Sequence, residues 1–166
     1  MRSFVLSLVI SLCFAISAFA QSTPLDTLTP PLPTHNERLA ADIASYVPVV
    51  INLTLDTKAS WDAPDRKLAF EKEAVRLGVT IGVSEAVKLL VHRERPCYPS
   101  CGIDSPTSSF YSMHTALAFS ALGGPRFEIA FPLAITAGGL RVAAGKHYLT
   151  DVLVGAAAGT AASFIR

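Results

Sequence analysis

Prolines and glycines divide the chain after residue 36 into five segments, and each segment has the apolar periodicity of an α-helix. The sequence has no clear alternation of apolar and polar residues that would predict strands, and it has no internal repeat. The predicted helices span about residues 37–55, 64–93, 113–122, 126–142 and 149–165. The chain is therefore predicted to be all-α, a compact bundle of about five helices.

Three prolines are expected to shape or limit the first two helices. Pro48 lies inside the first helix and is expected to kink or split it, because proline lacks the backbone N–H. A turn around Pro64 separates the first helix from the second, and Pro96 ends the second.

The last helix carries two signals of its own. Thr150 is predicted to be its N-cap. Gly155 and Gly159 lie four residues apart, which predicts that another helix approaches closely there.

The first twenty residues predict a signal peptide. Arg2 is followed by the apolar stretch 4–16 and by the small-x-small cleavage site Ala18-Phe19-Ala20. The alternative is an uncleaved membrane anchor. Residues 21–36 are rich in proline and predict a linker, which leaves 37–166 as the folded domain. We therefore expect a periplasmic or secreted protein.

Charge and cysteine content narrow the functional classes. The formal net charge is +1 and there is no basic stripe, so no nucleic-acid partner is expected. Removal of the signal peptide leaves Cys97 and Cys101, an even number in an exported chain, which predicts a disulfide. A metal site would need four ligands, and no second His or Cys pair lies nearby to complete one.

The first group of candidate site residues is Lys88, then six residues, then Arg95-Pro96. Seven helical steps return to nearly the same direction, so Lys88 and Arg95 are expected on one face near the end of the second helix. Two cations there would bind an oxyanion or phosphate. The alternative is a solvated basic helix end, and His92 and Arg93 are interpreted as such flanking surface residues.

The second group is Ser112-Met113-His114, between a loop and the start of a helix. Unpaired N–H groups at a helix N-terminus bind anions, and the Ser112 hydroxyl would add a donor. His114 would be placed to protonate a leaving group. The alternative is that Ser112 only caps the helix and His114 lies on the surface.

The third group is Arg141, then His147, then Asp151. His147 and Asp151 are four residues apart across a helix start, so the carboxylate is expected to reach the imidazole and fix its tautomer. The other ring nitrogen would then be available as a base, nucleophile or ligand. A helix-capping salt bridge is the alternative.

The order of the three groups resembles that of the type-2 phosphatidic acid phosphatase superfamily, which includes bacterial acid phosphatases, lipid phosphatases and vanadium haloperoxidases. Its signature is Lys-x6-Arg-Pro, then Pro-Ser-Gly-His, then Ser-Arg-x5-His-x3-Asp. The first part is complete here; the second reads Tyr111-Ser112-Met113-His114 and the third contains Leu140-Arg141, His147 and Asp151. The resemblance covers about residues 84–160.

The resemblance implies a role for each residue. His147 would attack phosphorus and form a phosphohistidine, Asp151 would orient His147, and His114 would protonate the leaving oxygen. The phosphoryl oxygens would be bound by Lys88, Arg95, Ser112, Met113 and Arg141. No metal or other cofactor is implied. Tyr111, Met113 and Leu140 replace the Pro, Gly and Ser of the signature, but every charged and nucleophilic group is retained.

The sequence leaves several questions open. The uncharged stretches are shorter than the about 20 residues of a spanning helix, which favours a domain that is soluble or lies on a membrane surface. The expected substrate is a phosphorylated small molecule or lipid. Rival interpretations are a vanadium-dependent haloperoxidase and a non-catalytic phosphate-binding relative. The oligomeric state is not indicated.

Overall fold

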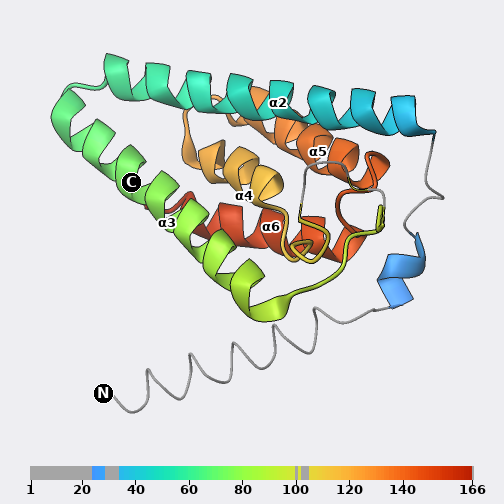
Figure 1. Ribbon diagram of the computed structural model, residues 1–166. Helices are drawn as coiled ribbons and strands as arrows, with labels where there is room; N and C mark the ends of the chain where they lie inside the picture. Colours follow the sequence, from blue (N-terminus) through green and yellow to red (C-terminus); the bar gives the residue numbers. More distant parts are fainter. Residues whose placement is uncertain (1–23, 29–33, 100, 102–104, 166) are drawn as a thin grey trace, which may run out of the picture.

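All five predicted helices form, and the residues that the structure describes contain no strand (Figure 1). The computed structural model describes residues 24–28, 34–99, 101 and 105–165. The predicted signal peptide and parts of the predicted linker lie outside these residues. The elements are η1 (Pro24–Leu28), α2 (His35–Asp62), α3 (Arg66–Val91), α4 (Met113–Ser120), η2 (Ala121–Gly123), α5 (Phe127–Ala143) and α6 (Leu149–Ala162). The all-α prediction is confirmed.

Helix α2 is longer than predicted and begins at a capping box. The Thr34 hydroxyl accepts a bond from the Glu37 N–H, and the Glu37 carboxylate accepts one from the Thr34 N–H at 2.9 Å. The expected split at Pro48 does not occur: Pro48 is buried within one continuous helix. Packing of α2 along α5 compensates for the single backbone hydrogen bond that proline removes.

Within the described residues, α2 is the one helix long and apolar enough, by length and composition, to cross a membrane.

The other helix boundaries follow from local chemistry. Asp65 caps α3 by accepting a bond from the Leu68 N–H at 3.0 Å. Helix α3 ends where His92 adopts a left-handed conformation, with φ of 50°. The prediction that Thr150 caps the last helix is wrong, because Tyr148 is the N-cap and Thr150 lies inside α6.

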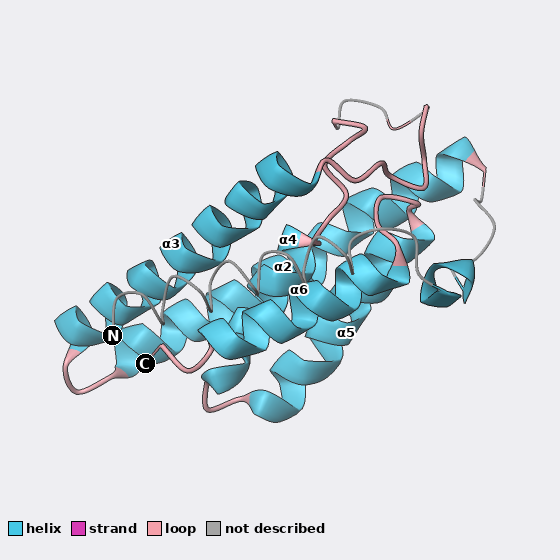
Figure 2. Cartoon of the chain, turned by 90° about the horizontal axis from the view of Figure 1, so that it is seen from below, coloured by secondary structure: helices cyan, strands magenta, loops and turns pink. Residues whose placement is uncertain are grey.

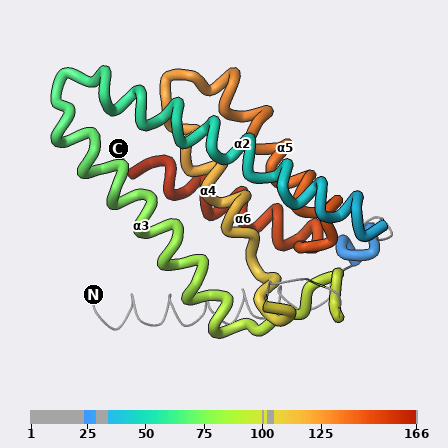
Figure 3. The backbone as a smooth tube through the Cα atoms, turned by 45° about the horizontal axis from the view of Figure 1, so that its top comes forward, coloured from blue at the N-terminus to red at the C-terminus, as the bar shows by residue number. Residues whose placement is uncertain are grey.

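Helix α4 lies at the centre of the bundle, in contact with α2, α3, α5 and α6 (Figure 3). It packs on α6 through the predicted pair of glycines. A Cβ atom added to Gly155 would lie 2.6 Å from the Ser112 carbonyl oxygen, and one added to Gly159 would lie 2.2 Å from that of Ala116. The expectation of a close helix approach at these two residues is confirmed.

The helix ends that carry the three sequence motifs meet at one end of the bundle. There α2 begins, α3 ends, α4 begins, α5 ends and α6 begins. Figure 2 shows the long connection between α3 and α4 at that end and the α2–α3 turn at the other. The candidate residues are therefore gathered by topology, although they are far apart in sequence.

Candidate active site

His147 is the centre of the site, in the short connection between α5 and α6. Gly145 turns the chain just before it with a φ of 67°, a conformation that glycine adopts without strain. The His147 side chain is 2% exposed, and its Nδ1 lies 2.6 Å from the Ser109 carbonyl oxygen. A carbonyl oxygen only accepts, so Nδ1 carries the proton and the lone pair is on Nε2.

The surroundings of His147 favour its neutral form. Burial is the main cause that lowers its pKa, the guanidinium groups of Arg141 and Arg95 also lower it, and Asp151 opposes the shift; together they place the pKa at about 4. The imidazole therefore keeps a nucleophilic lone pair throughout mildly acidic and neutral solution.

The lowered pKa of His147 gives a prediction about stability. Between pH 6.5 and about pH 4 the unfolded chain binds a proton at this residue that the folded chain does not, so stability falls as the pH falls through that range. The contribution is on the order of 3 kcal/mol. Unfolding free energies at pH 7 and pH 4 should differ less in His147→Asn than in the wild type. An equal pH dependence in both proteins would contradict this assignment.

Asp151 supports His147 indirectly, through Ser109. Its Oδ2 atom lies 3.8 Å from His147 Nδ1, so the expected contact is present at ion-pair distance but is too long for a hydrogen bond. Oδ2 instead accepts from the Ser109 hydroxyl at 2.5 Å and from the Tyr148 N–H at 2.9 Å. Burial raises the pKa of Asp151, but the contacts with His147, Arg93 and Ser109 outweigh it and hold the pKa below its ordinary value.

Arg93 is part of this network, and its interpretation as a flanking surface residue is wrong. Its side chain is 8% exposed, and Nη1 donates to Asp151 Oδ1 at 2.5 Å. The chain turns inward after the left-handed His92, which remains exposed, so Arg93 points back onto the start of α6.

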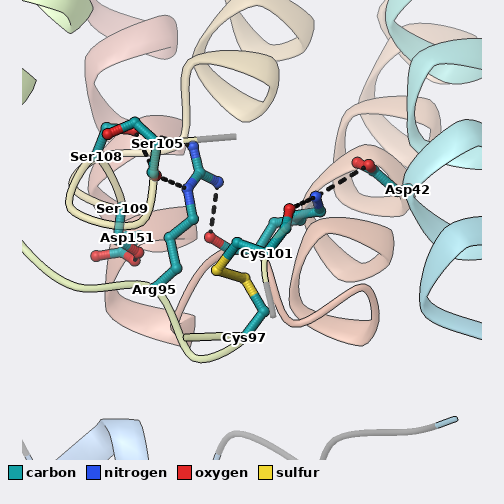
Figure 4. The surroundings of a disulfide bond; sticks show 9 residues. Asp42, Arg95, Cys97, Cys101, Ser105, Ser108, Ser109 and Asp151 are labelled. Carbon is teal, nitrogen blue, oxygen red and sulfur yellow. Dashed lines mark hydrogen bonds and ion pairs between the residues drawn. A yellow bond between two sulfur atoms is a disulfide. The ribbon is translucent and has the colours of Figure 1, made fainter. Parts of the chain in front are cut away.

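The two predicted arginines lie close enough to His147 for their charges to act on the imidazole. The Arg95 guanidinium donates to the carbonyl oxygens of Ser105 and Lys146 and to the Ser108 hydroxyl at 3.2 Å (Figure 4). Arg141, in the last turn of α5, is 2% exposed and forms an ion pair with Asp42 of α2. Both charges are therefore held rigidly near the imidazole.

The Cys97–Cys101 disulfide braces the loop that carries Arg95 (Figure 4). The Cys101 carbonyl oxygen accepts a bond from Lys146 Nζ at 2.9 Å, and the same Nζ lies 3.4 Å from Asp42 Oδ2. The Cys97 N–H donates to the Gly145 carbonyl at 2.9 Å. The disulfide loop is thus joined to the connection that presents His147.

The second motif lies beside the third. The Ser112 N–H donates to the Asp151 carbonyl at 3.1 Å, which joins the start of α4 to the start of α6. The Ser112 hydroxyl caps α4, accepting from the Thr115 N–H and hydroxyl, and Met113 is the first helical residue. The His114 ring packs edge-on against Tyr46 of α2, with 4.6 Å between ring centroids.

Lys88 does not share a helix face with Arg95 as expected. Helix α3 ends at Val91, so Arg95 belongs to the following loop, where its N–H donates to the Pro106 carbonyl. Lys88 Nζ pairs with Glu85 at 2.8 Å. In the described part of the chain, Lys88 forms no hydrogen bond or ion pair with the other candidate residues.

Sequence reasoning missed Asp26, Asp42, Ser109 and Lys146. Asp42 had a signal, because it is the one charged residue between Arg38 and Asp56 in an otherwise uncharged stretch of the first predicted helix. The other three had none, since each contributes through tertiary contacts.

Comparison with known families agrees with this arrangement. Among the described residues, no group of three or more His, Cys, Asp or Glu side chains that could hold a metal ion is found. A family model described as the PAP2 superfamily matches residues 73–166, which contain all three motifs. Comparisons with curated proteins and with solved structures give no match. The matched region is more than half of the chain, and the protein belongs to the PAP2 superfamily.

Proposed function

We propose that the protein is an exported, metal-independent phosphatase that hydrolyses phosphate monoesters, lipid phosphates or pyrophosphates through a phosphohistidine. The observation that carries the proposal is the fixed orientation of His147: Nδ1 donates to the Ser109 carbonyl, and the charges of Arg95 and Arg141 act on the imidazole. A buried neutral imidazole near two cations suits attack on an anionic phosphoryl group. The predicted signal peptide and the disulfide support export.

The proposed reaction has two steps. In the first, Nε2 of His147 attacks phosphorus, the bond to the leaving oxygen breaks, and His114 gives that oxygen a proton. In the second, water attacks the phosphohistidine, His114 takes the proton of the water, and the P–N bond breaks to release inorganic phosphate. Arg95 and Arg141 neutralise charge on the phosphoryl oxygens in both steps.

The three departures from the family signature are compatible with activity. The Tyr111 ring is buried, its hydroxyl bonds to Ser84 of α3, and burial raises its pKa, so it fills space behind the loop. Met113 opens α4 and retains the backbone N–H that a phosphate would use. Leu140 is half-buried in the last turn of α5.

The test is phosphate release with EDTA present, followed by rapid acid-free quenching of a ³²P-labelled substrate. We expect turnover to survive EDTA and the label to be found on the peptide that contains His147. Candidate substrates are p-nitrophenyl phosphate, phosphatidic acid and a polyprenyl pyrophosphate. Halide oxidation that appears on addition of vanadate would favour the haloperoxidase instead. Phosphate binding without turnover would favour the non-catalytic relative.

We further propose that the sides of the bundle formed by α2 and α3 contact lipid. Several polar side chains of these two helices point toward the interior of the protein. The two carboxylates of α2 between Leu39 and Thr57 both face the protein: Asp42 pairs with Arg141 and Asp56 pairs with Arg76. All four buried residues of α3 are polar, namely Glu73, Arg76, Thr80 and Ser84. The apolar stretch presented to the outside is therefore longer than the uncharged stretches of the sequence.

Many outward side chains in the middle of these helices are large and apolar, although Glu85 of α3 is also exposed. On α2 they include Ile43, Val47, Val50 and Ile51, and on α3 Val75, Val79, Val83, Leu89 and Leu90. A helix on the surface of a water-soluble bundle has the opposite pattern, whereas lipid-exposed helices turn polar residues inward. Helix α2 has 28 residues, so it is about 42 Å long and exceeds the roughly 30 Å hydrocarbon core of a bilayer.

Flotation with phosphatidylcholine vesicles tests this surface. We expect the wild type to float with the vesicles and the double variant Val50→Glu/Val79→Glu to lose at least about tenfold in its bound-to-free ratio, because two charges would enter hydrocarbon. Asn36→Glu adds a charge in the exposed first turn of α2, outside the apolar stretch, and should float like the wild type. A wild type that stays in buffer as a monodisperse monomer or oligomer would contradict the proposal.

A further inference from the structure

We propose that Asp26 is a positioning residue for the hydrolysis: it holds Arg93 against Asp151 and so fixes the network behind His147. The inference rests on the function proposed above. Asp26 belongs to η1, a short 3₁₀ helix inside the segment that the sequence predicted to be a linker, and η1 packs against α6. The Asp26 side chain is 6% exposed, which is unusual for a charged residue in a linker.

The contacts of Asp26 are specific. Its Oδ2 accepts from Arg93 Nη2 at 2.5 Å, and its Oδ1 accepts from the Thr150 hydroxyl at 2.6 Å. Arg93 Nη1 donates in turn to Asp151 Oδ1 at 2.5 Å and to the Thr150 hydroxyl at 2.8 Å. The guanidinium also stacks over the Tyr148 ring, 4.3 Å from its centroid. Arg93 is therefore held between two carboxylates and one aromatic face.

This arrangement continues to the nucleophile through four hydrogen-bonded or ion-paired contacts. Arg93 donates to Oδ1 of Asp151, and the Ser109 hydroxyl donates to Oδ2 of the same carboxylate. The Ser109 carbonyl oxygen in turn accepts a hydrogen bond from Nδ1 of His147. If Arg93 moved, Asp151 would therefore also move, and so would Ser109, whose carbonyl aligns the His147 imidazole. Residues that orient a metal ligand by hydrogen bonds contribute about 10–100-fold in activity, and an effect of the same order is expected for this contact.

Charge gives Asp26 a second effect. Two buried carboxylates share one guanidinium, so the group behind His147 carries a net charge of about −1 when all three are ionised. The imidazole gains positive charge as it bonds to phosphorus, and a net negative group behind it stabilises that change. Asp26 does not contact the substrate in this scheme, so its loss should lower kcat and leave KM nearly unchanged.

The test is a double-mutant cycle on the full chain with Asp26→Asn and Arg93→Met. We expect Asp26→Asn to lower kcat by about 10–100-fold with KM within about twofold. In the Arg93→Met background the same change should have a clearly smaller effect, because positioning through Arg93 is already lost and only the effect of charge remains. If Arg93→Met fails to fold, Arg93→Lys replaces it. Glu37→Gln, a carboxylate change that only affects the cap of α2, is the matched control and should leave kcat unchanged.

A second measurement separates this inference from the proposed function. NMR titration of His147 should show a lower pKa in Asp26→Asn than in the wild type, whether or not the protein hydrolyses any substrate tried. Additive effects of the two substitutions, or an unchanged His147 titration, would overturn the role of Asp26. Loss of wild-type turnover with a shifted titration would instead refute the phosphatase and leave the network intact.

Discussion

Replacing His147 with asparagine should lower kcat for phosphate release by at least about 10⁴-fold. Asparagine retains an N–H donor that can bond to the Ser109 carbonyl, so the network around it should persist. It lacks a nucleophilic nitrogen, because its amide lone pair is delocalised. Binding of phosphate or vanadate should therefore change far less than turnover. Measuring kcat and vanadate inhibition on one preparation checks both expectations.

His92 offers the matched control for this substitution. It is exposed, lies at the left-handed end of α3, and makes the same His→Asn change possible outside the site. Asparagine tolerates the left-handed conformation well, so His92→Asn should retain wild-type turnover. If His147→Asn kept more than about a tenth of the wild-type kcat, nucleophilic attack by His147 would be excluded.

Substituting alanine for Gly159 should destabilise the fold by about 2–4 kcal/mol, even though alanine favours helices. The new Cβ would lie 2.2 Å from the Ala116 carbonyl oxygen and 2.8 Å from the Phe119 Cβ. Neither atom belongs to a flexible side-chain end, so α6 must move away from α4. Unfolding followed by circular dichroism, in the buffer or detergent that keeps the wild type folded, measures the change.

Gly139 provides the opposite expectation. It lies inside α5, and nothing within 4 Å would meet its Cβ, apart from its neighbours and its own helix. Gly139→Ala should therefore be neutral or stabilise the fold by up to about 1 kcal/mol. Equal destabilisation by Gly139→Ala and Gly159→Ala would show that helix packing is not the cause.

The periodicity and turn residues predicted the helices because both act locally. Gly155 and Gly159 also revealed a tertiary contact, since small residues four apart have few other uses on a helix. Pro48 misled the prediction, because the cost of one proline is local while the packing that offsets it comes from α5, which is distant in sequence.

The candidate site was predicted unevenly. The order of motifs identified His147, Asp151, Arg95 and Arg141, which the structure brings together. Their connections were not predictable: a side-chain periodicity cannot show that the Ser109 carbonyl lies between Asp151 and His147. The prediction for Lys88 was wrong for a different reason. It placed Lys88 and Arg95 on one helix face, which required α3 to continue past His92, but α3 ends at Val91.

The gathering of helix ends at one end of the bundle affects how substrate would arrive. In the proposed lipid-contacting orientation, the apolar sides lie in the hydrocarbon and the site lies at the depth of the head groups. A phosphorylated lipid would then find the site by diffusing in two dimensions within its leaflet. Turnover would follow the mole fraction of substrate in the membrane, so dilution by inert lipid would slow the reaction at constant total concentration.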